Sequence, residues 1–363
     1  MDEVTVLLEQ LVENPDDAGL LAVLGDVLEG RGDSRGELIA MQLGIKQSSL
    51  ADAVAIGRRR EELIAQHTPE LVQLLRGGEK FVWGAGYIRR FELGMRTGNP
   101  MDVAAWLDDP TGREVIADAL AELWAHPSMQ LLQELVATAA SAIALFAINP
   151  PHAVRVLTIA RGSPADIEAL GELVAKLPHL QRIQVLGDPE LDRLVHPTVA
   201  TVAIDSYSTV SRVADLSRAR LPGLRRLEIH HRHHARDPLD EVLEYLARGG
   251  LLDRLTHLTL PNGELSMQGV TALAGGLGTR TLTRLELGDR DPIPRHVSDA
   301  LAKLTDELVA LVAPEATTAV EHANKPEWGR GTIVRRYDNK IEIEFANAGT
   351  KVFKADAAFL RYV

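Results

Sequence analysis

Apolar residues near the start of the chain recur at the spacing of an amphipathic helix. Two such stripes occur, Val4, Leu7, Leu8, Leu11 and Val12 and then Leu20, Leu21, Leu24 and Leu28. The Asn14-Pro15-Asp16-Asp17 segment between them is typical of a turn, so the pattern predicts a helical hairpin. A glycine-rich loop at 30–36 then precedes another helix, which begins near Leu38.

The middle of the chain repeats a different frame, L-x-x-L-x-L. Eight copies occur, and their second apolar positions are Leu135, Leu157, Ile183, Val202, Leu227, Leu258, Leu285 and Leu311. Most intervals between copies lie within or near the roughly 20 to 29 residues of one leucine-rich repeat. Helix-like stripes separate the copies, for example Leu239, Val242, Leu243 and Leu246.

This alternation predicts one strand and one return helix per unit. A single unit cannot exclude water from its own apolar face, so the units must stack. The fold class predicted for the middle of the chain is therefore an α/β leucine-rich-repeat-like solenoid. A doubly wound fold also alternates strands and helices, but it would require a glycine-rich phosphate loop after its first strand, and none is present.

After Ala313 and Pro314 the pattern changes to short alternating strands. Segments 332–334, 341–345 and 351–353 read as strands, with turns at 338–340 and 348–349, which indicates a small all-β SH3/Tudor-like barrel. The predicted organisation is a helical domain (1–80), the repeats with the strand that leads into them (81–313), a linker (314–324) and the barrel (325–363).

Composition agrees with several packed units. A chain of 363 residues that is 45% hydrophobic and 25% charged is too long for one ordinary core and too apolar for disorder. The absence of cysteine excludes disulfides, thiolate metal sites and a cysteine nucleophile. With no basic, apolar leader and no long apolar run, we expect a cytoplasmic protein without membrane contact.

Charge is unevenly distributed along the chain. The formal net charge is −12, yet residues 325–363 carry +3 and the rest carries −15. Such an acidic body argues against broad nucleic-acid binding, because phosphate contacts need clustered Lys and Arg. The contrast predicts two surfaces that serve two partners.

The first hundred residues resemble a known family. Asp26, Leu28, Glu29, Arg31-Gly32-Asp33, Arg35-Gly36-Glu37, Ile39 and Gln42 resemble the repeat-companion domain found ahead of leucine-rich repeats in bacteria with large genomes. The sequence departs from that pattern at Val27, usually aromatic, and at Ser34, usually proline. Residues 83–91 are similar to the strand that leads this family into its repeats.

The charged loop 31–37 has two interpretations. In the first, Asp33 caps the next helix, and Arg31, Arg35 and Glu37 form local ion pairs. In the second, Arg31 and Arg35 form a site for a partner or an anion. The loop supplies no nucleophile with a base. Because the rest of the sequence also shows no triad, paired-carboxylate motif, phosphate loop or metal signature, we predict no catalytic residue and no enzyme.

Residues between the frame positions are predicted to face one side of the sheet, where parallel strands align them in columns. The partner-binding candidates on this repeat face are Arg182, Gln184, Arg226, Glu228, His257, Thr259, Arg284 and Glu286. The alternative is a solvated face of weak ion pairs.

A histidine-rich segment, 230–234, follows one of the frame strands. Adjacent loop residues cannot all converge on one ion, and no His-Glu-x-x-His helix accompanies them. We therefore predict no metal site and no cofactor, and regard the segment as a solvated loop or a pH-sensitive rim contact.

The C-terminal segment resembles a second family. Trp328 to Val334, Ile343-Glu344-Phe345, Gly349-Thr350-Lys351 and Leu360 resemble the Tudor-like tail of bacterial DNA-repair helicases. In that family the barrel contacts RNA polymerase or nucleic acid, so the resemblance implies binding without chemistry. The candidate residues are Trp328, Arg330, Arg335, Arg336, Tyr337 and Lys351, although Trp328 and Phe345 are also candidates for the core.

These observations together predict a non-enzymatic protein-protein interaction scaffold. The repeats would bind one protein partner and the barrel a second, with transcription or repair machinery among the candidates. The alternative is a nucleic-acid-associated regulator that contacts DNA or RNA through the barrel. The sequence carries no signal for the oligomeric state.

Overall fold

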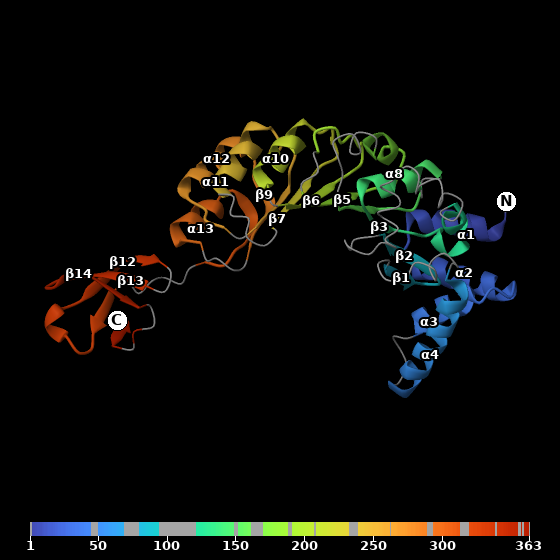
Figure 1. Cartoon of the computed structure of the whole chain (residues 1–363), viewed down its shortest axis with the longest axis horizontal. Helices are drawn as coiled ribbons and strands as arrows, with labels where there is room; N and C mark the ends of the chain where they lie inside the picture. The colour runs from blue at the N-terminus through green and yellow to red at the C-terminus, as the bar shows by residue number, and fades with distance from the viewer. Residues whose placement is uncertain are drawn as a thin grey trace, which may run out of the picture.

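A computed structural model shows N-terminal helices, a ten-stranded, mostly parallel sheet and a five-stranded antiparallel half-barrel at the C-terminal end. The structure describes residues 2–44, 50–68, 80–93, 121–148, 152–160, 170–187, 191–206, 208–231, 239–261, 263–288, 293–312, 319–337, 340–354, 357 and 359–362. The molecule forms an arch: the large sheet lies on its inner side, and the helices that connect the strands of this sheet lie on its outer side (Figure 1). The predicted α/β class is confirmed at this level.

The N-terminal unit consists of helices packed on the first hairpin of the sheet. Its helices are α1 (Glu3–Glu13), α2 (Ala18–Gly30), α3 (Arg35–Gly44) and α4 (Leu50–His67). The turn at 14–17 ends in Asp17, whose carboxylate accepts hydrogen bonds from the backbone N–H groups of Gly19 and Leu20 and so caps α2. Leu11, Leu24 and Ile39 are fully buried in its core.

One glycine of the charged loop lets two helices approach closely. A Cβ on Gly36 would lie 2.5 Å from the carbonyl oxygen of Gly25 and 2.8 Å from the backbone nitrogen of Glu29. The backbones of α2 and α3 therefore meet at this point, which explains a glycine between Arg35 and Glu37.

The large sheet runs in sequence order. Its strands are β1 (Lys80–Gly84), β2 (Tyr87–Glu92), β3 (Glu134–Ala137), β4 (Val156–Ile159), β5 (Arg182–Leu186), β6 (Thr201–Ser206), β7 (Arg226–His231), β8 (His257–Leu260), β9 (Leu282–Leu287) and β10 (Thr305–Val309). The β1–β2 pair is antiparallel, and every later neighbouring pair is parallel. The β1–β2 turn uses Ala85 and Gly86, both at positive φ, as a tight hairpin requires.

Helices return the chain between most of the parallel strands. They are α8 (Ala139–Ile148), α10 (Thr209–Arg218), α11 (Leu239–Arg248), α12 (Met267–Leu277) and α13 (Arg295–Leu301). The stripe predicted in α11 is confirmed, because Leu239, Val242, Leu243 and Leu246 are all buried. One continuous apolar cluster extends from Ile88 to Leu301 behind the strands.

The rule of one helix per unit is wrong between β5 and β6. Residues 191–200 pass between these strands in turns and an isolated bridge. His196 is 1% exposed there, and its Nδ1 accepts hydrogen bonds from the backbone N–H groups of Thr198 and Val199, each 3.2 Å away. The short interval leaves no length for a helix, and a buried imidazole satisfies the backbone instead.

The eighth frame is also placed wrongly by the sequence pattern. Leu308 pairs with Leu285 and Thr305 with Leu282, so the second apolar position of the last strand is Leu308. The predicted second position, Leu311, lies beyond β10 and is 47% exposed. Polar Thr305 occupies the first frame position of this strand. A frame of three apolar residues therefore fits the sequence only three residues later, beginning at Leu308.

The half-barrel has five strands, and the first of them lies in the segment predicted as a linker. Its strands are β11 (Ala319–His322), β12 (Gly331–Tyr337), β13 (Lys340–Phe345), β14 (Gly349–Lys354) and β15 (Leu360–Tyr362), in the order β14-β13-β12-β11-β15. The assignment of β11 to a linker is therefore wrong, since it pairs with both β12 and β15. Val320, Ile341, Ile343, Phe345 and Leu360 form a core separate from that of the large sheet.

Within these described segments, none of the helices combines the length and apolarity that a bilayer crossing would need.

Candidate binding surfaces

The side chains on the inner side of the sheet form two columns in register. The first contains Arg90, Glu134, Val156, Arg182, Thr201, Arg226, His257, Arg284 and Glu307. The second contains Glu92, Val136, Thr158, Gln184, Ala203, Glu228, Thr259, Glu286 and Val309. The predicted register is thus observed, and β2 and β10 lengthen each column by one position at either end.

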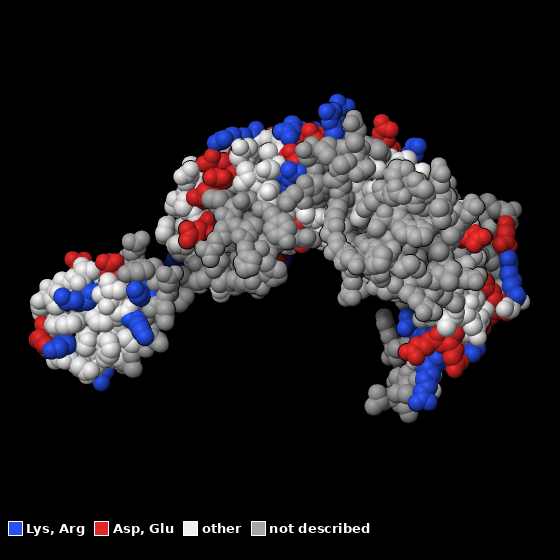
Figure 2. All heavy atoms as spheres, viewed as in Figure 1, with Lys and Arg blue, Asp and Glu red and all other residues white. Residues whose placement is uncertain are grey.

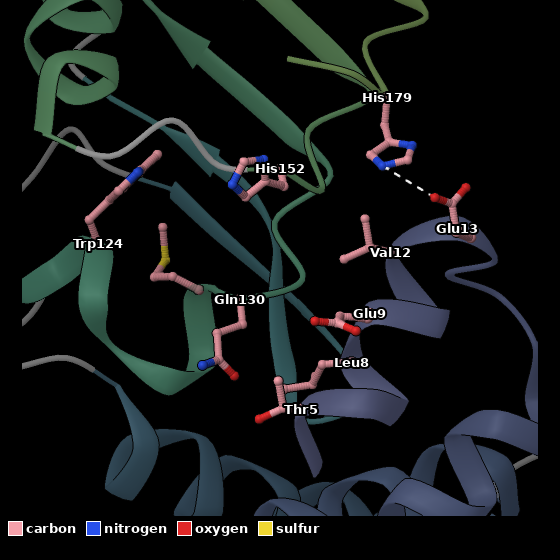
Figure 3. Close-up of a pocket in the computed structure, with 10 residues that line it drawn as sticks. Thr5, Leu8, Glu9, Val12, Glu13, Trp124, Gln130, His152 and His179 are labelled. Atoms are coloured by element: carbon pink, nitrogen blue, oxygen red, sulfur yellow. Dashed lines mark ion pairs between the residues drawn. The ribbon is translucent and has the colours of Figure 1, made fainter. Parts of the chain in front are cut away.

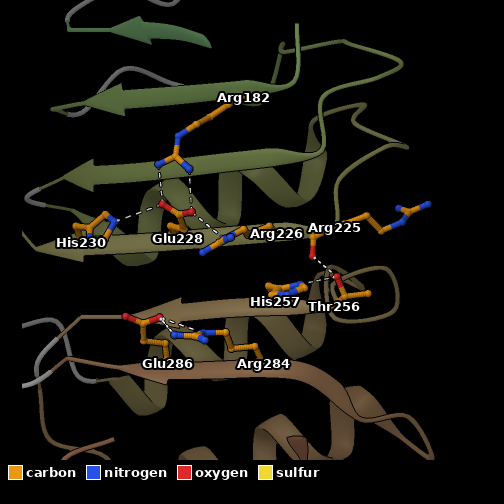
Figure 4. Close-up of polar contacts among 9 residues, drawn as sticks. All are labelled: Arg182, Arg225, Arg226, Glu228, His230, Thr256, His257, Arg284 and Glu286. Atoms are coloured by element: carbon orange, nitrogen blue, oxygen red, sulfur yellow. Dashed lines mark hydrogen bonds and ion pairs between the residues drawn. The ribbon is translucent and has the colours of Figure 1, made fainter. Parts of the chain in front are cut away.

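Glu228 lies at the centre of the charged part of this ladder. Two nitrogens of Arg182 bind its carboxylate oxygens at 2.8 and 2.6 Å, and Arg226 Nε lies 2.9 Å away (Figure 4). His230 Nε2 lies 3.8 Å from the same carboxylate. Arg182 reaches across β6, where the small Thr201 and Ala203 leave room for it.

This environment strongly favours the ionised carboxylate. The neighbouring His230 imidazole and Arg182 guanidinium lower the pKa of Glu228 to about 2. The opposing effect of burial is outweighed, although Glu228 is only 8% exposed. Glu228 is therefore a fixed negative charge surrounded by fixed positive charges.

A second charge network lies at the C-terminal end of the sheet. Arg284 Nη2 lies 3.1 Å from Glu286, and Arg284 Nη1 lies 2.8 Å from Glu307 on β10. At the other end, Arg90 lies 3.1 Å from Glu134 and 3.5 Å from Glu92. Most charges of the ladder are therefore compensated by their neighbours before any partner arrives.

Uncharged polar side chains lie between these networks. His257 and Thr259 are half-buried, and His257 Nδ1 bonds Thr256 Oγ1 at 2.9 Å. Gln184, also half-buried, lies in the same column as Glu228 and Thr259. These groups offer donors and acceptors in a fixed register between fixed charges.

The charged residues of the N-terminal loop form ion pairs, as in the first interpretation, but only the pair of Arg35 with Asp33 is local in sequence. Arg35 binds Asp33 through two nitrogens, Arg31 pairs with Asp2 at 2.7 Å, and Arg59 pairs with Glu37 at 2.8 Å. Asp33 Oδ1 also accepts a hydrogen bond from the backbone N–H of Arg35 at the start of α3. Arg31 and Arg35 are thus held by different carboxylates and do not converge on one anion.

Trp328 belongs largely to the core of the half-barrel. It lies in the short helix η3 (Pro326–Trp328), with its ring 5.3 Å from Phe345 and 4.8 Å from His322. Lys351 Nζ lies 5.9 Å from the centre of the Trp328 ring, within the range of a cation–π contact. Both the core interpretation and the partner interpretation of Trp328 thus have a contact in their favour.

The other barrel candidates are distributed over several strands. Arg330 is exposed and lies 3.8 Å from Glu321. Strand β12 contains Arg335, Arg336 and Tyr337, whose side chains the structure does not describe. Basic side chains are spread over the visible face of the half-barrel, with acidic ones at its margin (Figure 2).

The structure pairs two lysines of the half-barrel that the sequence analysis did not select. Lys340 and Lys354 lie directly opposite each other on β13 and β14. Like charges at such a position repel, and no acidic partner is found for either within the described residues. The only sequence signal for this pair was the register of the predicted hairpin.

The histidine-rich segment lies mainly outside the described residues, which end at the backbone of His231 and resume at Leu239. Among the residues that are described, three or more His, Asp or Glu side chains are nowhere close enough together to hold a metal ion.

Sequence reasoning missed a groove between α1 and the first strands of the large sheet. It encloses about 430 Å³ and is lined by Thr5, Leu8, Glu9, Val12, Glu13, Trp124, Met129, Gln130, His152 and His179 (Figure 3). A second groove of about 550 Å³ adjoins it at His179. The contributing residues are far apart in the sequence, so no local motif could indicate the groove.

Comparison with known protein families gives a match at the C-terminal end of the chain. Residues 316–363 match a family described as "Protein of unknown function (DUF3553)", and this match includes all five strands of the half-barrel. A search of curated proteins finds no match to the chain. The family match covers the C-terminal half-barrel and does not extend to the ten-stranded sheet.

Proposed function

We propose that the chain is a non-enzymatic scaffold that binds a protein partner on the inner side of its large sheet. We further propose that this sheet is a leucine-rich-repeat-like solenoid preceded by a repeat-companion domain. The apolar frame residues at each strand, the return helices and the sequential parallel order all support this assignment.

The observation that carries the proposal is the compensated charge ladder around Glu228. A face with free cations would suit phosphate groups, but Arg182 and Arg226 are already bound to a carboxylate. Pre-positioned charges of both signs, with polar groups between them, favour a partner with a complementary pattern of mixed charges. Protein surfaces have such patterns, whereas nucleic-acid backbones do not.

Affinity capture with the full chain tests this role. We expect Thr259→Arg, on the inner face, to reduce capture of the partner at least about tenfold, because a long cationic side chain between Glu228 and Glu286 would change the charge pattern that the partner meets. The matched control is Thr271→Arg on the exposed face of α12, which should capture as the wild type does. Equal capture by both variants, at equal thermal stability, would show that the inner face is not the binding surface.

The half-barrel favours a second candidate function, direct contact with nucleic acid or with an acidic surface of transcription or repair machinery. Lys340 and Lys354 support it, because they lie opposite each other without an acidic partner among the described residues, and an anion would relieve their repulsion. We expect the full chain to bind DNA with a strong salt dependence that Lys340→Gln/Lys354→Gln weakens. Salt-insensitive capture of a protein, unchanged in this variant, would favour the scaffold role alone.

A further inference from the structure

The groove beside α1 combines an apolar floor with an acidic wall. Leu8 and Val12 point into it from α1, and Trp124 lies on the opposite side, in the segment that leads into β3 (Figure 3). Met129, from the same segment, also lines the groove. Glu9 and Glu13 lie on the same wall as Leu8 and Val12, one helical turn apart.

The two carboxylates are not equivalent. Glu13 Oε1 lies 3.6 Å from His179 Nε2 at the junction with the second groove. Glu9 points across the groove toward Gln130 and has no cationic partner among the described residues (Figure 3). A carboxylate of this kind, beside an indole and apolar side chains, suits a cation on an apolar stem.

The groove is held open by contacts on its outer side. Arg155 Nη2, from the residue before β4, donates to the carbonyl oxygens of Val12 at 2.8 Å and Glu13 at 2.6 Å. Arg89 Nη2 donates to the carbonyl oxygen of Pro15 at 3.1 Å. These bonds fix the C-terminal end of α1 against the sheet, so the acidic wall keeps its distance from Trp124 and Met129.

The adjoining groove has a different character. It lies at the amino ends of β4, β5 and β6, and its lining is mostly uncharged: Val156, Pro178, His179, Gln181, Arg182, Thr198, Ala200 and Thr201. Arg182, its one permanent charge, is already bound to Glu228. This second groove therefore suits the neutral, polar main chain of a partner better than it suits a second charged group.

We infer that the two adjoining grooves bind an extended segment of a partner protein, with a Lys or Arg side chain in the groove beside Glu9 and the following residues along β4 to β6. The apolar stem of that side chain contacts Leu8, Val12 and Met129, and its cation lies between Glu9 and Trp124. The inference rests on the proposed protein-binding role for the nature of the ligand. The groove beside α1 lies outside the two inner columns, whereas the second groove shares Val156, Arg182 and Thr201 with the first column.

The test uses the full chain and short peptide libraries with random flanks and one fixed central residue, either Lys, Arg, norleucine or Glu. Norleucine keeps the apolar stem of lysine without its charge. We expect Lys and Arg libraries to be retained about tenfold more than norleucine, and Glu to be retained least. Equal retention of Lys and norleucine, or no retention of any library, would overturn the inference.

Two variants on α1 locate the site. Glu9→Gln should remove most of the preference for Lys and Arg over norleucine, whereas Glu3→Gln, the same change at an exposed position outside the groove, should leave it intact. Thr5→Lys places a cation on the exposed groove wall four residues before Glu9 and should abolish retention. Unchanged preference in Glu9→Gln would contradict the assignment.

Two further comparisons separate the outcomes. If n-butylammonium competes with the Lys library as effectively as free Lys peptides do, the groove is a small-amine site and the extended-segment inference is wrong. If Thr259→Arg abolishes partner capture but the libraries show no cation preference, the scaffold role stands and this inference fails. If the libraries show the preference while Thr259→Arg captures normally, the two grooves are the binding surface and the part of the inner columns around Thr259 is not.

Discussion

Glu228 is the side chain whose electrostatic environment is most clearly defined on the inner face. Its pKa falls from 4.5 to about 2 in the folded chain, so the folded state binds fewer protons than the unfolded state between these values. Its contribution to stability is complete above pH 4.5 and is lost as the pH falls toward 2.

This leads to a pH-dependent prediction for Glu228→Gln. We expect the variant to lose about 1 to 3 kcal/mol at pH 7, because Arg182 and Arg226 lose their carboxylate. The difference from the wild type should shrink as the pH falls from 4.5 toward 2, as measured by urea unfolding. Parallel stability curves over that range would contradict the assigned role of Glu228.

His196 provides a second prediction at this scale. Burial lowers the pKa of His196 below 6.5, so the unfolded chain takes up a proton first and stability declines as the pH falls below 6.5. His196→Ala should cost about 1 to 3 kcal/mol at pH 7, because the N–H groups of Thr198 and Val199 lose their acceptor. A variant with wild-type stability, or with an unchanged pH slope, would show that the imidazole does not support this turn.

At the scale of elements, the crossing of α2 and α3 determines how the N-terminal helices pack. We expect Gly36→Ala to destabilise the chain by about 1 to 3 kcal/mol, because its Cβ would overlap the backbone of α2. Gly57→Ala in α4 is the matched control, since nothing lies within 4 Å of its added Cβ, and it should stabilise by about 1 kcal/mol. Thermal unfolding measures both, and a neutral Gly36→Ala would refute the close crossing.

Arginines in the loops that precede β8 and β9 link successive units of the sheet. Arg254 Nη1 donates to the carbonyl oxygen of Leu221 at 3.1 Å, and Arg280 Nη1 donates to that of Leu252 at 3.0 Å. Each bond joins the loop of one unit to the loop before it. The stacking of units therefore depends on these polar ties as well as on the apolar frame.

At the scale of the whole molecule, the large sheet and the half-barrel have separate cores. We therefore expect two unfolding transitions in calorimetry. Leu227→Ala should lower only the transition of the large sheet, with a cost of about 2 to 5 kcal/mol, and Phe345→Ala should lower only that of the half-barrel. If either variant shifts both transitions equally, the two cores are coupled and this division is wrong.

The sequence alone determined most strands of the parallel sheet, the register of the inner columns and the two turns of the half-barrel. These features follow from local periodicity, because a strand alternates its faces and a buried stripe repeats with the helical turn. The same reasoning failed where a polar residue replaced a frame residue, at Thr305, and where a buried His196 replaced a helix. It also left β11 out of the half-barrel, because a strand of four residues carries little pattern.

Only the tertiary structure decided which side chains meet. The bond from Arg182 to Glu228 joins residues 46 positions apart, and that from Arg155 to Val12 joins residues 143 apart. Such contacts depend on how strands and helices stack, and periodicity within one element carries no information about them. The compensated ladder and the groove beside α1 therefore exist only once the units are assembled.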